Sequence, residues 1–395
     1  MNNKHITIIS FILFLSVSCN QQNNDSQFPI SSWAKSSIEA EGLKREPFDD
    51  LQNGIENGVY GYVDQVLLIK NGKLVFNQSY SNDYEKISMG KSGVLGCGFA
   101  TCEDSTAFGD YNYYHPQWHP YYQNQQVHTL QSVTKSIASI MIGAAIKEGD
   151  IKDTEVKILD FFDEYDLTVA EEYLKTATLE NLLTMQLGME WHELDRPADM
   201  TNTTSQLEVS QDWIQFTLNQ PMDTIPGTKW VYNSGASQLL SGIIKKATGL
   251  SIEDYAKKHL FTPLGIENLH WKKTPTGYTD TEGGLFLEAQ DLAKIGYLML
   301  NNGMWDGQQI ISSEWAKRSI SKQVEFDKEK GYGYQWWRED QDEVEIWACK
   351  GFGGQFLLVF PRFQTIAVVN SWNIFDEKIE SILEATKTAV IESNS

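Results

Sequence analysis

The sequence predicts a mixed α/β (α+β) fold: one antiparallel sheet, built from both ends of the chain and flanked by helices, with a mostly helical subdomain inserted at about residues 151–284. β-rich segments occur at residues 63–80 and again throughout the last quarter of the chain. The segments between these ends carry the apolar periodicity, the cap residues and the terminal glycines of helices. Strands at both ends with helices between them indicate that the two ends share one sheet.

The composition is that of a folded protein with a sizeable core. The chain has 395 residues, of which 41% are apolar, and we assign residues 56–395 to one main domain preceded by an N-terminal segment at 20–55. Its 53 acidic and 32 basic residues give a formal net charge of −21, and no basic run occurs. Nucleic acid is therefore not expected as a partner.

Residues 1–19 have the pattern of a secretory signal peptide, with a lysine near the start, an apolar run at 6–17 and small residues before Cys19. The run is too short to span a bilayer. The Ser18–Cys19 step resembles the lipobox of bacterial lipoproteins, although Leu15 stands one place further from the cysteine than that family prefers. The resemblance implies lipidation at Cys19, membrane contact only through that anchor, and export to the bacterial cell envelope, facing the periplasm or the surface; an ordinary cleaved signal is the alternative.

Three cysteines follow this signal: Cys97, Cys102 and Cys349. In an oxidising envelope, Cys97 and Cys102 could close a short disulfide loop, which would leave Cys349 as a lone thiol. Metal binding by two such cysteines lacks a second pair to complete the site. Cys97 and Cys102 lie within residues 90–127, a tract with many aromatic residues that we interpret as a long, well-packed loop.

The predicted elements follow in chain order. Asn71 and Gly72 divide the first β-rich segment and form the dipeptide that a two-residue type I′ hairpin requires. A buried helix is predicted to begin at Ser132, where apolar and small residues recur at helical spacing, and to end at Gly149. Further helices are expected at residues 241–249, 251–260, 288–303 and 312–320, and a last one at about 376–392.

Ser132 and Lys135 stand three positions apart at the start of this buried helix. Side chains at that spacing share one helix face, so the lysine can reach the serine hydroxyl. Burial lowers the pKa of a lysine, and an uncharged Lys135 could take the proton of Ser132, while amides at the helix N-terminus face any oxyanion formed there. The alternative is that Ser132 is a helix N-cap and Lys135 extends to solvent. The same spacing recurs without this context at Ser32 with Lys35, Ser88 with Lys91, and Ser319 with Lys322.

Further stretches accompany "SVTK" in a fixed order, at residues 179–191, 226–244, 260–266, 283–300 and 350–361. With them the chain resembles the serine β-lactamase and penicillin-binding-protein superfamily. The branch concerned groups class C β-lactamases, D-amino-acid peptidases, carboxylesterases and 6-aminohexanoate-oligomer hydrolases. The resemblance implies a β-lactamase-like fold in which Ser132 is the nucleophile and Lys135 stands beside it.

The second motif of this superfamily is a tyrosine followed two places later by asparagine or serine, and Tyr232 with Ser234 matches it. The resemblance implies that Tyr232 acts beside Lys135 as base and then as acid. Class C β-lactamases have an asparagine where Ser234 stands, and it would contact a substrate amide. Ser234 is therefore the expected substrate-binding residue, and it departs from the pattern of true β-lactamases.

The third motif, KTG or HxG at a strand end in relatives, matches "CKGFG" in two ways. Either Lys350 is the cationic residue, or Cys349 takes its place and Gly351 is the motif glycine. In both alignments backbone amides around Phe352 would supply an oxyanion donor. Gly351 and Gly353 on either side would permit close approach of the substrate.

Together these residues predict a serine hydrolase that cleaves an ester or amide of a small molecule or peptide through an acyl-enzyme intermediate, with no cofactor and no metal. Three alternatives stay open. They are a true β-lactamase or D,D-peptidase acting on β-lactams or peptidoglycan stem peptides, a non-catalytic envelope binding protein on the same fold, and a metallohydrolase using His115 and His119. No GxSxG elbow occurs, which argues against an α/β-hydrolase. The oligomeric state stays open.

Overall fold

The computed structural model describes residues 28–29, 31–88, 120–168, 172–196, 201–374 and 378–395. The expectations placed on Cys19, Cys97, Cys102, His115 and His119 lie outside these residues. Within the described ranges, no helix combines the length and the apolar character needed to cross a membrane.

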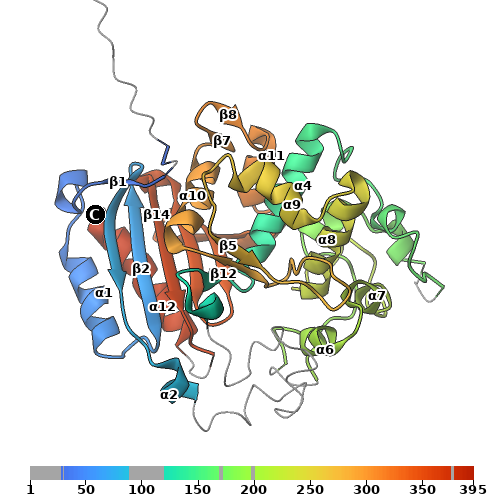
Figure 1. The fold of residues 1–395 in the computed structure, drawn as a ribbon, viewed down its shortest axis with the longest axis horizontal. Helices are drawn as coiled ribbons and strands as arrows, with labels where there is room; N and C mark the ends of the chain where they lie inside the picture. Colours follow the sequence, from blue (N-terminus) through green and yellow to red (C-terminus); the bar gives the residue numbers. More distant parts are fainter. Residues whose placement is uncertain (1–27, 30, 89–119, 169–171, 197–200, 375–377) are drawn as a thin grey trace, which may run out of the picture.

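A nine-stranded sheet forms the centre of the protein, in the order β1-β3-β2-β14-β13-β12-β11-β10-β9 (Figure 1). β1 runs parallel to β3, and the other neighbouring pairs are antiparallel. β2 from the N-terminal part pairs directly with β14 from the C-terminal part, which confirms that both ends of the chain build one sheet. The strands are β1 (Ala34–Lys35), β2 (Val63–Lys70), β3 (Lys73–Ser79), β9 (Val324–Glu325), β10 (Lys330–Tyr332), β11 (Trp337–Gln341), β12 (Val344–Gly351), β13 (Gln355–Phe360) and β14 (Thr365–Ser371).

The hairpin between β2 and β3 has the turn that its sequence predicts. Lys70 pairs with Lys73 across the turn, and Asn71 and Gly72 adopt positive φ angles of 51° and 73°. A type I′ turn requires positive φ at both central residues, and its twist matches that of the flanking strands. The two turn residues therefore help to set the register of β2 against β3.

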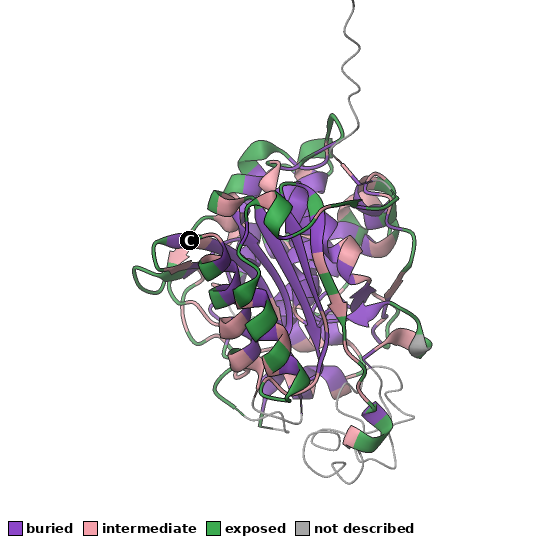
Figure 2. Cartoon of the chain, turned by 90° about the vertical axis from the view of Figure 1, so that its left-hand side faces the viewer, coloured by how far each residue is buried: buried purple, intermediate pink, exposed green. Residues whose placement is uncertain are grey.

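Helices cover both faces of the sheet. α1 (Glu46–Glu56) and α12 (Ile379–Ser393) pack together on one face, and α10 (Ala289–Leu300) with α4 (Val133–Glu148) lies on the other (Figure 1). Because successive strand residues point to opposite faces, Val66 of β2 enters the core under α1 and α12, whereas Leu67 enters the core under α10 and α4. Figure 2 shows the buried strands between helices whose outer surfaces are exposed.

Most of the remaining helices lie beside the face that carries α4. They are α5 (Leu179–Leu183), α6 (Thr203–Val209), α7 (Trp213–Leu218), α8 (Ser234–Thr248), α9 (Ile252–Ala256) and α11 (Ser313–Ile320), while the short α2 (Tyr84–Ser88) follows β3. A second sheet, β4 (His128–Thr129), β6 (Leu285–Leu287) and β5 (Leu269–Trp271), joins the turn before α4 to a segment far along the chain. A last pair of strands is β7 (Met304–Trp305) and β8 (Gln308–Gln309).

α4 is buried at every residue from Val133 to Ala145. Gly149 follows it with a φ of 86° and ends the helix, as its sequence predicts. Gly143 lies so close to α11 that a Cβ atom there would be 2.3 Å from the ring of Trp315. Small residues on α4 thus let its neighbours approach, and this packing fixes where the N-terminus of the helix lies.

Gly143→Ala is expected to destabilise the protein by about 1–3 kcal/mol, the usual cost of forcing extra volume into a packed core, even though alanine is the better helix former. Chemical denaturation measures this free energy. Ser139→Ala on the same helix is the matched control. The buried Ser139 hydroxyl has no hydrogen-bond partner among the described residues, so its loss should be neutral or stabilising. Wild-type stability in Gly143→Ala would contradict the packing argument.

Candidate active site

Ser132 lies at the N-terminal end of α4, after a turn in which the backbone is strained. Gln131, the preceding residue, has a φ of 48°, in the left-handed region that non-glycine residues rarely occupy. Ser132 holds the N-cap position of α4, yet its side chain makes no capping hydrogen bond. Its side chain instead lines a cleft, so capping does not account for this serine.

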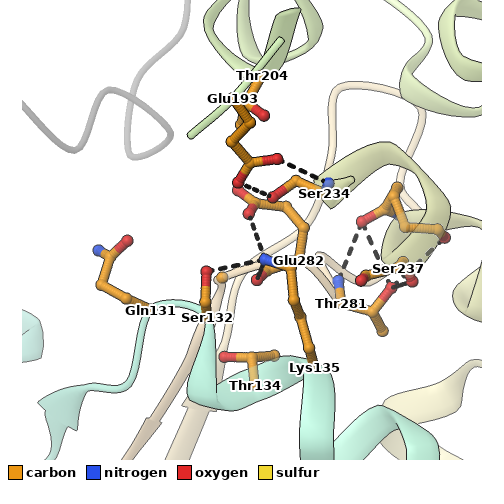
Figure 3. Close-up of polar contacts among 12 residues, drawn as sticks. Gln131, Ser132, Thr134, Lys135, Glu193, Thr204, Ser234, Ser237, Thr281 and Glu282 are labelled. Carbon is orange, nitrogen blue, oxygen red and sulfur yellow. Dashed lines mark hydrogen bonds and ion pairs between the residues drawn. The ribbon is translucent and has the colours of Figure 1, made fainter. Parts of the chain in front are cut away.

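Lys135 lies one turn into α4 and is almost completely buried, with 1% of its surface exposed. Its Nζ atom donates a hydrogen bond to Ser132 Oγ at 2.8 Å and another to the backbone carbonyl of Glu282 at 2.6 Å. Oε2 of the Glu282 carboxylate lies 3.3 Å from the same nitrogen. Figure 3 shows the ammonium group held between the serine and the glutamate, so Lys135 does not extend to solvent.

The charge of Lys135 differs from the one that its sequence position suggested. Burial lowers the pKa of this amine, but the carboxylates of Glu282 and Glu193 are among the groups that raise it by more. The net pKa lies above the ordinary value of lysine, so Lys135 is an ammonium group in the resting protein. The expectation of an uncharged amine was wrong. The prediction considered only the effect of burial on the Lys135 pKa, because the Glu282 carboxylate is 147 positions away in the sequence.

Tyr232 joins this pair from the residues just before α8. Its phenol lies near enough to Ser132 for that side chain to lower the pKa of the phenol, and the Lys135 ammonium lies 5.3 Å from the centre of its ring. Burial raises the pKa of the phenol, and the nearby ammonium offsets part of that rise. The ring also stacks on Trp337, with centroids 5.9 Å apart and planes at 25°. Three residues from two distant segments therefore meet at the cleft.

Ser234 begins α8 and is fully buried. Its hydroxyl donates a hydrogen bond to Glu193 Oε1 at 2.7 Å, and its amide donates one to Glu193 Oε2 at 2.9 Å (Figure 3). Asn233 caps the helix, with its side-chain oxygen accepting from the amide of Ala236 at 2.8 Å. Tyr232 and Glu193 line the cleft, whereas Ser234 is not part of its lining.

Gln335 connects the two helices that carry these motifs. Its carbonyl accepts a hydrogen bond from Ser136 of α4 at 2.5 Å, and its side-chain oxygen accepts one from Ser237 of α8 at 2.7 Å. Its side-chain amide donates to the carbonyl of Leu183 in α5 at 3.1 Å. These three contacts are buried, and they fix the position of the N-terminal turn of α4 relative to that of α8.

The end of β12 brings the third predicted segment to the same cleft. Cys349 points toward α4, and burial raises the pKa of its thiol by more than a hydrogen bond with Ser136 lowers it. Lys350, the next residue along the strand, forms an ion pair with Glu339 of β11. Glu339 also pairs with Lys387 of α12, at 3.2 Å. The side chains of Cys349 and Lys350 thus point to opposite faces of the sheet.

The glycine after them packs directly against the turn that carries the serine. A Cβ atom at Gly351 would lie 2.5 Å from the carbonyl oxygen of Leu130, so this contact requires glycine. Phe352 is 39% exposed at the rim of the cleft, and Gly353 has a φ of 108°. Lys350, Gly351 and Phe352 all belong to the lining of the cleft.

The cleft has a volume of about 510 Å³ and opens beside Ser132. Residues 193–196 and 202–208 contribute mostly polar and charged groups to its lining, whereas Phe356 of β13 and Ile379 and Leu383 of α12 contribute apolar ones. In the part of the chain that the structure describes, no group of three or more His, Cys, Asp or Glu side chains is placed to hold a metal ion.

A family model described as Beta-lactamase matches residues 55–378. The chain belongs to the β-lactamase family. Among curated proteins, a 6-aminohexanoate-dimer hydrolase from Paenarthrobacter ureafaciens is 25% identical over 270 residues, which make up 62% of this chain and 66% of that protein. The match therefore spans slightly less than two thirds of the length of that relative.

Solved structures confirm the β-lactamase-like fold. A candidate 6-aminohexanoate-dimer hydrolase from Bacillus anthracis superposes with a TM-score of 0.67 at 20% identity, covering 91% of this chain and 87% of that one. A D-stereospecific amidohydrolase from Streptomyces sp. gives a TM-score of 0.60 at 13% identity, with 85% and 97% covered. A hydrolase with promiscuous acyltransferase activity, EstCE1, gives 0.63 at 12% identity, with 89% and 99% covered.

Three carboxylates of this β-lactamase-family site were not found from the sequence: Glu193, Glu208 and Glu282. All three line the cleft. A usable signal existed only for Glu282, which precedes a pair of glycines. There Asp280 Oδ1 accepts the amide hydrogens of Glu282 and Gly283 at 3.1 and 3.0 Å, a turn that an Asp–x–Glu–Gly–Gly sequence favours.

Glu193→Gln is expected to destabilise the protein by about 1–3 kcal/mol, because the buried amide and hydroxyl of Ser234 lose a charged acceptor. The midpoint of urea unfolding measures the change. Glu190→Gln, three residues earlier on the same segment, is the matched control. Its side chain is 55% exposed, so its removal should cost less than about 0.5 kcal/mol. Equal stability of the two variants would show that Glu193 does not hold the start of α8.

Proposed function

We propose that this protein hydrolyses esters or linear amides through an acyl-enzyme formed on Ser132. The observation that carries the proposal is the hydrogen bond of 2.8 Å between Lys135 Nζ and Ser132 Oγ at the wall of the cleft, which Tyr232 also lines. A hydroxyl beside these two groups has a route along which its proton can leave as it attacks a carbonyl carbon.

The reaction would proceed in two steps. Ser132 Oγ bonds to the carbonyl carbon of the substrate while its proton is passed on through Lys135, and Tyr232 then gives a proton to the departing alcohol or amine. Amides at the N-terminus of α4 and around Phe352 stabilise the negative charge on the carbonyl oxygen. Water attacks the acyl-enzyme in the second step and releases the acid, which restores the Ser132 hydroxyl.

An ester or linear amide is favoured over a β-lactam by the position of Ser234. Its hydroxyl is buried and bonded to Glu193, so it is not presented to a substrate amide in the way that the asparagine of class C β-lactamases would be. The name of the Paenarthrobacter ureafaciens relative, a 6-aminohexanoate-dimer hydrolase, supports a linear amide. Hydrolysis of β-lactams or of peptidoglycan stem peptides is the second candidate, and membership of the β-lactamase family favours it.

A non-catalytic binding protein would have little use for this arrangement. Burying an ammonium group beside a hydroxyl costs free energy, and a binder gains nothing from it that an apolar residue would not supply. The strained backbone at Gln131, where φ is 48°, supports the same view, because such strain is concentrated at functional sites.

Ser132→Ala is expected to lower turnover of a chromogenic ester at least about a thousandfold, because no other group can form the acyl-enzyme. The melting temperature should stay within a few degrees of that of the wild type, since Ser132 makes no capping bond. Intact-mass analysis after a fluorophosphonate should show one adduct on the wild type and none on the variant. A variant that keeps full activity or the adduct would remove Ser132 from the role.

A comparison of substrates distinguishes hydrolysis of esters or linear amides from hydrolysis of β-lactams. Short-chain p-nitrophenyl esters, a 6-aminohexanoate linear dimer and a chromogenic cephalosporin are tested side by side at equal concentration. We expect the ester or the dimer to be cleaved at least tenfold faster than the cephalosporin, because Ser234 is held away from the cleft. Strong cephalosporin turnover without ester or dimer cleavage would reverse the order.

A further inference from the structure

A continuous line of polar groups runs inward from Ser132. Lys135 Nζ donates to Ser132 Oγ at 2.8 Å, and Glu282 Oε2 lies 3.3 Å from that nitrogen on its inner side. The Glu282 side chain in turn shares a hydrogen bond with Glu208 of α6. Glu208 and Glu282 are 6% and 4% exposed, so little water reaches the inner end of this line.

Each of the three buried groups in this line, Lys135, Glu282 and Glu208, is surrounded by other titratable side chains. Tyr232, Glu282 and Glu193 face the Lys135 ammonium, and Asp280 and Glu208 face Glu282 together with it. Glu208 faces Glu282 and Asp280 and is balanced in part by Lys272. Glu193 is occupied by the amide and hydroxyl of Ser234. Glu282 is therefore the carboxylate that is in hydrogen-bond contact with the lysine.

Neither neighbour of the Ser132 hydroxyl can accept its proton in the resting protein. Lys135 already carries its full set of protons, because its pKa is raised above the ordinary value by the surrounding negative charges. Tyr232 is protonated as well, because burial raises the pKa of its phenol. An acceptor beyond this first contact is needed for the attack of Ser132.

We propose that Glu282 is the positioning residue that acts through Lys135, by accepting one lysine proton as Ser132 delivers its own proton to the lysine. The proposal rests on the hydrolase function proposed above and deepens it. Lys135 first passes one hydrogen to Glu282 Oε2, so that an N–H bond breaks and an O–H bond forms, and the amine turns about its Cε–Nζ bond until the free lone pair faces Ser132 Oγ. The Ser132 O–H bond then breaks, and a new N–H bond forms on Lys135.

The charges in this step balance. Lys135 is an ammonium group before and after it, and the negative charge of Glu282 moves to the tetrahedral oxyanion of the substrate. When the tetrahedral species collapses, the proton returns along the same line through Lys135 and Tyr232 to the leaving group. Glu282 is a carboxylate again once the leaving group departs.

Glu208 keeps the acceptor in its active form. Burial and the charges of Glu282 and Asp280 raise the pKa of Glu208 well above its ordinary value, so Glu208 holds a proton and donates a hydrogen bond to Glu282. Two ionised carboxylates in contact would repel each other strongly in this desolvated position. The protonated Glu208 removes that repulsion and supplies a donor, and both effects favour an ionised Glu282.

The variant Glu282→Gln tests the proposal with little change of shape. It removes the acceptor, while the backbone carbonyl at this position, which accepts from Lys135 Nζ at 2.6 Å, remains to hold the lysine. Glu282→Asp keeps a carboxylate at a slightly longer distance. Asp291→Asn on α10 is the matched control, because it also removes a carboxylate, here 15% exposed, that pairs with a buried lysine, Lys294, at 2.9 Å, but away from the cleft.

We expect Glu282→Gln to lower kcat for a p-nitrophenyl ester at pH 7 by about a hundredfold to ten-thousandfold, the usual contribution of a base, with KM changed less than threefold. The pH profile should change form. The rate of the wild type rises as pH passes upward through the pKa of Glu282, which burial raises above its usual range, and then stays level. In Glu282→Gln, Lys135 must first lose a proton to solvent, so the rate should climb into the alkaline range. Glu282→Asp should restore most of the rate and the level profile.

Each possible result of these measurements either supports or overturns the proposed role of Glu282. Unchanged kcat and an unchanged acid limb in Glu282→Gln would overturn the proposal, and so would equal losses in Glu282→Gln and Asp291→Asn. If the wild type forms no Ser132 adduct with a fluorophosphonate, the hydrolase function itself fails, which is a different result from a wild type that labels normally. A fluorophosphonate reaction that is slowed in Glu282→Gln and not in Asp291→Asn supports the proposal independently of the substrate.

Discussion

The site depends on one ammonium group that is buried and yet charged. Moving such a group out of water costs several kcal/mol, and only close, well-placed acceptors offset that cost. Lys135 has the backbone carbonyl of Glu282 at 2.6 Å, the Ser132 hydroxyl at 2.8 Å and the Glu282 carboxylate at 3.3 Å. Every segment that supplies or supports one of these acceptors has to be held in place by the fold.

The large sheet and the helices around it provide that placement. α4 is enclosed from Val133 to Ala145, and its N-terminal turn meets the end of β12 where Gly351 allows contact with Leu130. Gln335 ties α4 to α8, which fixes Tyr232 just before α8. The turn that carries Glu282 is closed by Asp280 and joined to the strand before Ser132 through β6 and β4. Segments far apart in sequence thus converge around the buried ammonium group of Lys135.

Features set by short-range sequence patterns could be predicted, whereas features set by charged groups far apart in the sequence could not. Asn71 with Gly72, the glycine after α4 and the helical spacing of Ser132 and Lys135 act over a few residues, so the hairpin, the helix and the serine–lysine contact could be read from the sequence. The charge of Lys135 could not, because Glu282 lies 147 positions away and no short-range pattern connects the two. The partner of Ser234, Glu193, lies 41 positions away and was missed for the same reason.

The cost of these charged groups is itself an argument about their purpose. Glu193, Glu208 and Glu282 line the cleft beside Lys135, and such buried charges add little stability, since replacing buried ion pairs by well-packed apolar residues is often neutral or stabilising. Stability therefore does not explain why the carboxylates stand beside the lysine. Proton movement does, because a protonated lysine next to a protonated tyrosine can help a serine only if a further group takes a proton. The same interaction that keeps the ammonium charged thus supplies the place to which its proton can go.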